Sequence, residues 1–215
     1  MVRVLIVART QMGSNVCIGG LNLETNESLR LLGSDGSNQP RSVEFDVGQV
    51  WEIDYTPSQH ITLPHTEDVF VQKSQHVGRQ PHLRDFLLER IHPWCGGADQ
   101  LFDGLLVSER GSCYLPPYPK EYLPQVSTGL WLPETPLKQS GINSRYYIAL
   151  VDTKPYAYEE LGIHDEQLYI KYVGFSSPIR QLPAQTLIRV SLARWWNGEG
   201  RHELRCYLQL SGWYL

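Results

Sequence analysis

Two alternating runs at the end of the chain constrain its fold more than any other feature. Over residues 186–196, the aliphatic side chains alternate with polar ones in the order Ile188, Arg189, Val190, Ser191, Leu192. A second run over residues 203–215 alternates in the same way, with Leu204, Cys206, Leu208 and Leu210 in one set and Arg205, Tyr207, Gln209 and Ser211 in the other. Because successive side chains of a strand point to opposite faces, this period of two predicts two β-strands, each with an aliphatic and a polar face.

The composition of the chain indicates a packed globular protein. Hydrophobic residues make up 41% of its 215 residues, and aromatic residues make up 11%. A chain of this length forms one large β domain or two domains of about 100 residues each. It has no run of 18 apolar residues that would span a membrane, no pattern of a secretion signal, and four scattered cysteines. We therefore expect a cytoplasmic protein.

The charge balance limits the kind of nucleic acid that such a protein can bind. With a formal net charge of −4, the chain is not basic. Residues 1–124 carry 10 basic and 15 acidic side chains, whereas residues 125–215 carry 9 and 8. A protein that holds long nucleic acid without sequence preference depends on phosphate neutralisation and is usually basic. Any contact with nucleic acid is therefore expected to be a local patch in the C-terminal half.

Both halves of the chain contain five strand-like segments with turn residues between them. In the first half they span residues 2–8, 16–23, 28–32, 48–55 and 68–73, followed by a helix-like segment over 83–91. In the second half they span residues 128–132, 146–151, 168–174, 186–196 and 203–210. The intervening residues 93–124 are rich in proline and glycine and include a short helical turn near 101–107.

This order of elements predicts an all-β protein with one short helix, built as two tandem five-stranded OB-like barrels. The OB-fold is a common barrel of five strands. We expect a first OB-like barrel with a C-terminal helix over residues 1–92, a proline- and glycine-rich connector over residues 93–124, and a second OB-like barrel over residues 125–215. No sequence repeat links the two halves, so the prediction depends on the number and order of the elements.

Four segments of the chain carry a resemblance to a known family. They are the opening strand, the hairpin over residues 16–32 that ends in Arg30-Leu31-Leu32, the segment Pro64-His65-Thr66-Glu67-Asp68, and the C-terminal Arg205-Cys206-Tyr207-Leu208-Gln209-Leu210-Ser211-Gly212-Trp213. Together they resemble the bacterial dual OB-containing domain family over nearly the whole chain. The resemblance implies two OB-like barrels in tandem and the sensing or binding of nucleic acids or nucleotides, often within multi-gene defence systems. It supplies no catalytic residues.

The polar faces of the two C-terminal strands carry side chains that suit a nucleic acid. Arginine binds phosphate, tyrosine stacks on a base, and glutamine forms hydrogen bonds with a base edge. We therefore expect a non-catalytic binding site for single-stranded nucleic acid or a nucleotide, made of Arg189, Arg205, Tyr207 and Gln209. Two alternatives stay open for the same residues, which are the solvated face of an antiparallel sheet and a contact between the two barrels.

An aromatic cluster at the C-terminal edge leads to a competing hypothesis. Trp195, Trp196, Trp213 and Tyr214 lie at the ends of the same two strands. Aromatic residues and arginine are enriched in the centres of protein interfaces. The chain could therefore be a protein–protein adaptor that docks a partner through this edge. Adjacent residues of a strand face opposite sides, so at most one residue of each aromatic pair lies on any one face.

Metal binding and catalysis have little support in the sequence. His65, Glu67 and Asp68 lie together before a strand, and His92 and Cys95 have a spacing of three, but a structural zinc site needs four ligands and usually paired cysteines. The common nucleophile, metalloprotease and phosphate-loop motifs are missing. We therefore expect no catalytic residues, no metal site and no cofactor, although a catalytic site assembled from distant residues stays open.

Overall fold

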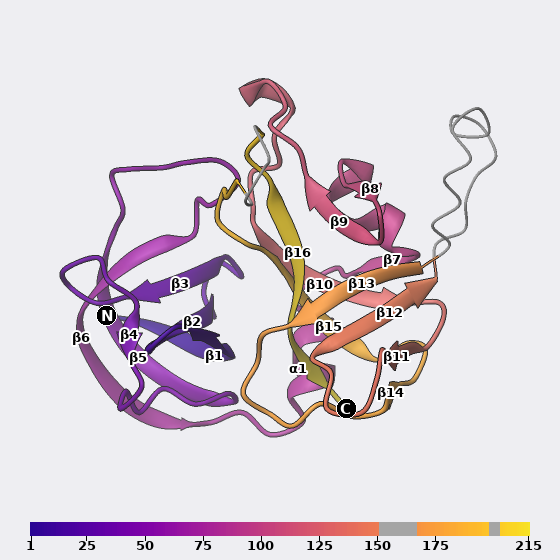
Figure 1. Ribbon diagram of the computed structural model, residues 1–215. Coiled ribbons are helices and arrows are strands. Elements are labelled where there is room, and N and C mark those ends of the chain that lie inside the picture. The colour runs from indigo at the N-terminus through magenta and orange to yellow at the C-terminus, as the bar shows by residue number, and fades with distance from the viewer. Residues whose placement is uncertain (151–166, 198–202) are drawn as a thin grey trace.

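The computed structural model describes residues 1–150, 167–197 and 203–215, which form two β-sheets side by side (Figure 1). The first half of the chain forms a six-stranded sheet and an α-helix, with the bounds β1 Val2–Met12, β2 Asn15–Asn22, β3 Ser28–Leu32, β4 Gln39–Pro40, β5 Gln49–Pro57, β6 Asp68–Arg79 and α1 Leu83–Leu88. The second half forms a ten-stranded sheet with two short 3₁₀ segments, with the bounds β7 Trp94–Gly96, η1 Ala98–Gly104, β8 Val107–Glu109, β9 Ser112–Leu115, η2 Lys120–Tyr122, β10 Thr128–Pro133, β11 Leu137–Gln139, β12 Tyr146–Leu150, β13 Gln167–Tyr172, β14 Gln181–Leu182, β15 Leu187–Leu192 and β16 Cys206–Tyr214.

Five strands of the first sheet close into a barrel in the order β1-β2-β3-β6-β5, with β5 paired back to β1. The pair β3–β6 is parallel and the other neighbouring pairs are antiparallel. Strand β1 is buried on both faces. Val4 and Ile6 belong to the core of the barrel, whereas Leu5 and Val7 pack outside it against the second half of the chain. This burial on two sides explains why its sequence is a continuous apolar run instead of an alternation.

The second sheet repeats this strand order. Its strand order is β12-β13-β16-β15-β10, which matches the order β2-β3-β6-β5-β1 of the first barrel. The pair β13–β16 is parallel, as β3–β6 is in the first barrel. The counterpart of β1 is broken in two, because β10 pairs with β15 and the separate strand β11 pairs with β12. Pro133 and Pro136 lie at the break, and proline lacks the N–H group that a continuous ladder needs. The predicted fold, an all-β protein with two tandem OB-like barrels, is confirmed.

The strand ends differ from the expected ones where the sequence is polar or exposed. Strand β6 is longer than expected, since residues 74–79 lack an apolar alternation but continue to pair with β5. The last strand begins at Cys206 and continues to Tyr214, and Leu204, which was expected on its aliphatic face, is exposed. Helix α1 ends three residues earlier than expected. Val151, the last residue of the expected strand over 146–151, lies outside the described residues.

The segment over residues 93–124, expected as a connector, is hydrogen-bonded into the second sheet. Strand β7 runs parallel to β10, and β9 runs antiparallel to β16. The indole N–H of the buried Trp131 donates a hydrogen bond of 2.9 Å to the Gly96 carbonyl. The ring of Trp94 lies directly against Gly129, where an added Cβ would be 2.2 Å from it. The segment therefore contributes strands to the second sheet, while the domain limits at residues 92 and 124 stay a prediction.

The two barrels are joined by a hydrophobic core of their own, which we call the shared core. It combines residues from both barrels and from α1, namely Leu5, Val7, Leu21, Leu87, Leu130, Leu187 and Tyr214. The Tyr214 hydroxyl donates a hydrogen bond of 2.6 Å to the Val7 carbonyl, and the Gln11 N–H donates one of 2.8 Å to the Val173 carbonyl. Strand β16 runs along the boundary between the barrels (Figure 1). The outer face of β1 and β2 is therefore covered by the second barrel.

Within the described residues, no helix combines the length and the apolar character needed to cross a membrane.

Candidate functional site

The four residues predicted to bind nucleic acid are divided between two sites. Arg189 lines a cavity between the barrels, whereas Tyr207 lines a groove on the outside of the second barrel, and Gln209 lines both. Arg205 lies next to this groove, over the ring of Tyr114. The alternation along β15 places Arg189 and Val190 on opposite faces as expected, and of the alternatives left open for Arg189 the structure shows a contact between the two barrels. The Arg189 side chain is only 7% exposed because the first barrel covers that face of β15.

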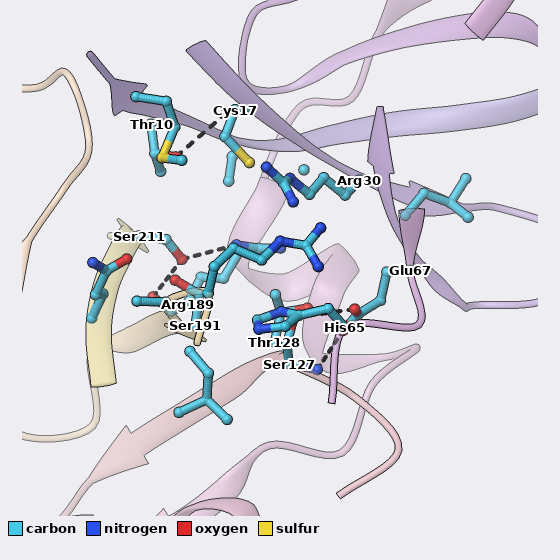
Figure 2. Close-up of a pocket in the computed structure, with 18 residues that line it drawn as sticks. Thr10, Cys17, Arg30, His65, Glu67, Ser127, Thr128, Arg189, Ser191 and Ser211 are labelled. Atoms are coloured by element: carbon cyan, nitrogen blue, oxygen red, sulfur yellow. Dashed lines mark hydrogen bonds between the residues drawn. The ribbon is translucent and has the colours of Figure 1, made fainter. Parts of the chain in front are cut away.

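The cavity between the barrels, which we call the interbarrel cavity, has a volume of about 70 Å³. The first barrel contributes Thr10, Cys17, Gly19, Arg30, His65 and Glu67, and the second contributes Ser127, Thr128, Arg189, Ser191, Arg194 and Ser211. Arg30 and Arg189 reach into it from opposite walls (Figure 2). The Arg189 Nη1 donates a hydrogen bond of 2.9 Å to the Ser211 hydroxyl, which in turn donates one of 3.0 Å to the Arg189 carbonyl.

Ion pairs tie the first barrel to the second beside this cavity. The Asp68 carboxylate pairs with Arg194 through one oxygen and lies 3.5 Å from the Arg30 Nη1 through the other. The Glu67 carboxylate accepts hydrogen bonds from Ser127, 2.5 Å from its backbone N–H and 3.1 Å from its hydroxyl. Glu67 and Asp68 belong to the segment over 64–68, so the motif that carried the resemblance forms part of the contact between the barrels.

The surroundings of the interbarrel cavity shift the pKa values of two buried groups. Burial, together with the positive charges of Arg194 and Arg30, lowers the pKa of His65 to about 3, so the imidazole is neutral at pH 7. Burial raises the pKa of Glu67, although its hydrogen bonds from Ser127 and the charge of Arg189 act in the opposite direction. The pKa of His65 therefore reflects its burial first and the nearby guanidinium groups of Arg194 and Arg30 second.

The groove on the second barrel, which we call the aromatic groove, has a volume of about 580 Å³. It is formed by β9, β12, β13 and β16 with the residues that follow β15, and its side chains include Tyr146, Tyr169, Lys171, Trp196, Tyr207 and Gln209. Tyr146, Tyr169 and Trp196 are 44%, 45% and 56% exposed. The rings of Trp196 and Tyr207 lie 6.0 Å apart between centroids. Strands β12 and β13 are the second and third strands of this barrel, which form the ligand-binding face of OB-folds.

Arg205 is held in place by neighbours within the chain. Its Nη1 lies 2.6 Å from the Glu109 carboxylate, and its guanidinium lies 4.0 Å from the centre of the Tyr114 ring. Tyr114 in turn lies 5.8 Å from Tyr207 between ring centroids. The side chain of Arg205 is therefore engaged with Glu109 and Tyr114 instead of extending freely into the groove.

Three of the four aromatic residues at the C-terminal edge pack inside the molecule. The Trp195 indole donates a hydrogen bond of 2.6 Å to the Leu63 carbonyl of the first barrel. The Trp213 ring packs against that of Tyr172 with centroids 4.3 Å apart and a tilt of 34° between the ring planes, and Tyr214 belongs to the shared core. Trp196 is the member of this cluster that is mainly exposed.

Sequence reasoning missed Tyr146, Tyr169 and Lys171 as candidate site residues. The signal was present, because Leu168 and Ile170 alternate with Tyr169 and Lys171 as regularly as the residues of the last strand do. In the structure the first pair is buried and the second is exposed. Strand pairing places Tyr146 opposite Lys171, so that these side chains lie on one face.

No metal centre accounts for the acidic and histidine residues near β6. In the part of the chain that the structure describes, no group of three or more His, Cys, Asp or Glu side chains is placed to hold an ion. His65, Glu67 and Asp68 are engaged in the contact between the barrels.

Two barrels with the same five-strand order, joined by a shared core, define a tandem OB-fold protein. The sequence profile of the dual OB-containing domain family matches residues 2–213. The chain therefore belongs to this family, which confirms the resemblance seen in the sequence. A search of curated proteins finds no significant match.

Proposed function

We propose that this protein binds single-stranded nucleic acid or a nucleotide through the aromatic groove of its second barrel. The observation that carries the proposal is the set of exposed aromatic side chains on the second and third strands of an OB barrel. Single-stranded nucleic acids bind such faces because every base has a flat surface that stacks on an aromatic ring.

The groove provides complementary contacts for the parts of a nucleotide. Tyr169, Trp196 and Tyr207 offer rings for stacking, Lys171 offers a cation for a phosphate, and Gln209 offers an amide for a base edge. With a net charge of −4 on the whole chain, the affinity depends on stacking more than on neutralising a long backbone. The ligand is therefore expected to be short.

Fluorescence anisotropy with short labelled single-stranded DNA and RNA tests the proposal. Stacking contributes about 1–3 kcal/mol per base, so the variant Tyr169→Ala/Trp196→Ala should bind about 30-fold more weakly or worse. Tyr122→Ala serves as the matched control, because Tyr122 is 64% exposed and lies outside the groove. The proposal is wrong if the wild type shows no salt-sensitive binding to either polymer, or if the double variant binds like the control.

A competing proposal, a protein–protein adaptor, rests on Trp196 alone among the aromatic residues of the C-terminal edge. Its three neighbours are already used within the chain. A stoichiometric protein partner that stays bound after nuclease treatment and is lost in Trp196→Ala would favour the adaptor. The role as a sensor or accessory component of a bacterial defence system, which the family resemblance implies, would apply to either proposal.

A further inference from the structure

A buried arginine with no carboxylate at ion-pair distance among the described residues marks the interbarrel cavity. Arg189 is 7% exposed, and the hydrogen bond that its guanidinium makes within the described residues is to the neutral hydroxyl of Ser211. Among residues 1–150, 167–197 and 203–215, no carboxylate lies within the ion-pair distance of 4.0 Å from its guanidinium. A buried charge is costly unless it is paired, so such a guanidinium needs an anion.

Two buried polar atoms of the cavity lining have no hydrogen-bond partner within the described residues. They are the Arg30 Nε and the Thr128 hydroxyl, both buried. The remaining nitrogens of Arg30 are used, since Nη1 faces Asp68 and Nη2 donates a hydrogen bond of 2.8 Å to the Asn38 side chain. Buried polar groups are nearly always hydrogen-bonded, so unpartnered ones at a cavity indicate a missing ligand or solvent.

The charges around the cavity favour an anion over a cation. Arg30, Arg189 and Arg194 face two carboxylates, of which Asp68 is shared between Arg30 and Arg194. The other carboxylate, Glu67, accepts two hydrogen bonds from Ser127, and the charge of Arg189 acts on it beyond ion-pair distance, so three guanidinium groups stand against two carboxylates. The surroundings of the cavity therefore hold an excess of positive charge.

We propose that the interbarrel cavity is a binding site for a phosphate group, held by Arg189 and by the unpartnered donors of Arg30 and Thr128. Guanidinium groups bind phosphate through paired hydrogen bonds, and a buried arginine is well suited to this. A volume of about 70 Å³ accommodates a group the size of several water molecules. Met12 and Arg194, which also line the cavity, are substantially exposed, so the ligand reaches it from solvent.

The phosphate group has two possible sources, inorganic phosphate and the phosphate of a nucleotide bound in the aromatic groove. The second source rests on the proposed function, whereas the phosphate site itself does not. Gln209 and Ala193 line both the cavity and the groove, so the two sites adjoin. A nucleotide with its base in the groove could then place its phosphate beside Arg189.

Isothermal titration calorimetry with inorganic phosphate, at constant ionic strength set with sodium chloride, tests the site. We expect one phosphate per chain for the wild type and affinity at least tenfold lower for Arg189→Met, which loses the buried charge. Thr128→Val, which removes the unpartnered hydroxyl at nearly constant volume, should bind phosphate several-fold more weakly. Binding that is absent in the wild type, or equal in the wild type and Arg189→Met, overturns the proposal.

A second variant keeps the test decisive if Arg189→Met does not fold. Gly19→Ala leaves every charge in place, but its Cβ would lie 2.8 Å from the Arg189 Nη2 and 3.2 Å from the Ala8 Cβ, so the guanidinium has to move. Folded Gly19→Ala should bind phosphate at least several-fold more weakly than the wild type. Unchanged phosphate affinity in this variant and in Thr128→Val contradicts the site.

Nucleoside monophosphates separate the two sources. If the phosphate comes from a nucleotide, a monophosphate binds more tightly than inorganic phosphate, and Tyr169→Ala/Trp196→Ala reduces its affinity to that of inorganic phosphate. If the phosphate is free, the monophosphate has no advantage and the double variant binds inorganic phosphate normally. If the protein binds phosphate but no oligonucleotide, the phosphate site in the interbarrel cavity is supported and the proposed function of the aromatic groove is contradicted. If it binds oligonucleotide but no phosphate, only the phosphate site is contradicted.

Discussion

The two barrels share one strand order but use the same face in opposite ways. In the first barrel, the outer face of β1–β3 is covered, with Leu5 and Leu21 in the shared core and Gly19 against the guanidinium of Arg189. In the second barrel, the corresponding face of β12 and β13 is open and presents Tyr169 and Lys171. The strand order therefore does not decide how a barrel is used. Small and apolar outward residues favour assembly, whereas exposed aromatic and cationic ones provide a ligand surface.

The largest expected effect concerns the covered face. Leu187→Ala removes a fully buried side chain from the shared core, and such substitutions cost about 2–5 kcal/mol of the free energy of unfolding. Because the shared core includes residues of both barrels, we expect the first and second barrels to lose stability together in one transition. Chemical denaturation followed by near-UV and far-UV circular dichroism measures both the loss and the cooperativity.

The exposed Leu204 provides the control for this substitution. Leu204→Ala should change the free energy of unfolding by no more than about 0.5 kcal/mol. Two separate transitions in the wild type, or a loss in Leu187→Ala no larger than in the control, would show that the barrels do not stabilise each other.

The difference between the barrels explains which parts of the fold could be predicted from sequence. Alternation of apolar and polar residues reveals the strands and shows which residues share a face. It correctly places Arg189 and Val190 on opposite faces of β15. It does not reveal what lies opposite each face, because that depends on how distant segments pack. The sequence left two environments open for the polar residues of the last two strands, a solvated sheet face and a contact between the barrels. The structure shows both, because Arg189 lies at the contact and Tyr207 lies at the surface.

Short or irregular elements limited the prediction in a second way. A register shift in the β15–β16 pairing leaves Ser211 unpaired, so that Trp213 faces the core of the second barrel and Tyr214 faces the shared core. A bulge of this kind reverses the alternation and has no signal in a period of two. Strands β7 and β8 have three residues each, which is too short to show any period. The segment over 93–124 therefore resembled a connector.

A pH titration sharpens the comparison at the contact between the barrels. Since the pKa of His65 falls from 6.5 to about 3 on folding, the unfolded chain binds a proton between these pH values that the folded chain does not. Stability contributed by the neutral imidazole is therefore lost as the pH falls below 6.5, by about 1.4 kcal/mol per pH unit. His65→Gln should lose stability less steeply between pH 6.5 and 4.5, as measured by urea denaturation at each pH.

Two features make this measurement specific. Glu67, whose pKa is raised above 4.5 on folding, contributes in the opposite direction above pH 4.5, so the informative quantity is the difference in slope between the wild type and His65→Gln. The exposed His60 provides a matched control, and His60→Gln should keep the wild-type slope. Equal slopes for all three proteins would contradict the inferred burial of a neutral His65.

The smallest expected effect tests the open face of the second barrel through its charge. Lys171 is exposed in the aromatic groove, whereas Lys73 is exposed on β6 of the first barrel. If Lys171 contacts one phosphate of a bound oligonucleotide, Lys171→Gln lowers the slope of log affinity against log salt by about 0.7 to 1. Lys73→Gln removes the same charge from the chain but should leave this slope unchanged. Equal changes in both variants would indicate that net charge, and not the position of Lys171 in the groove, governs binding, and the functional difference between the barrels would then lack support.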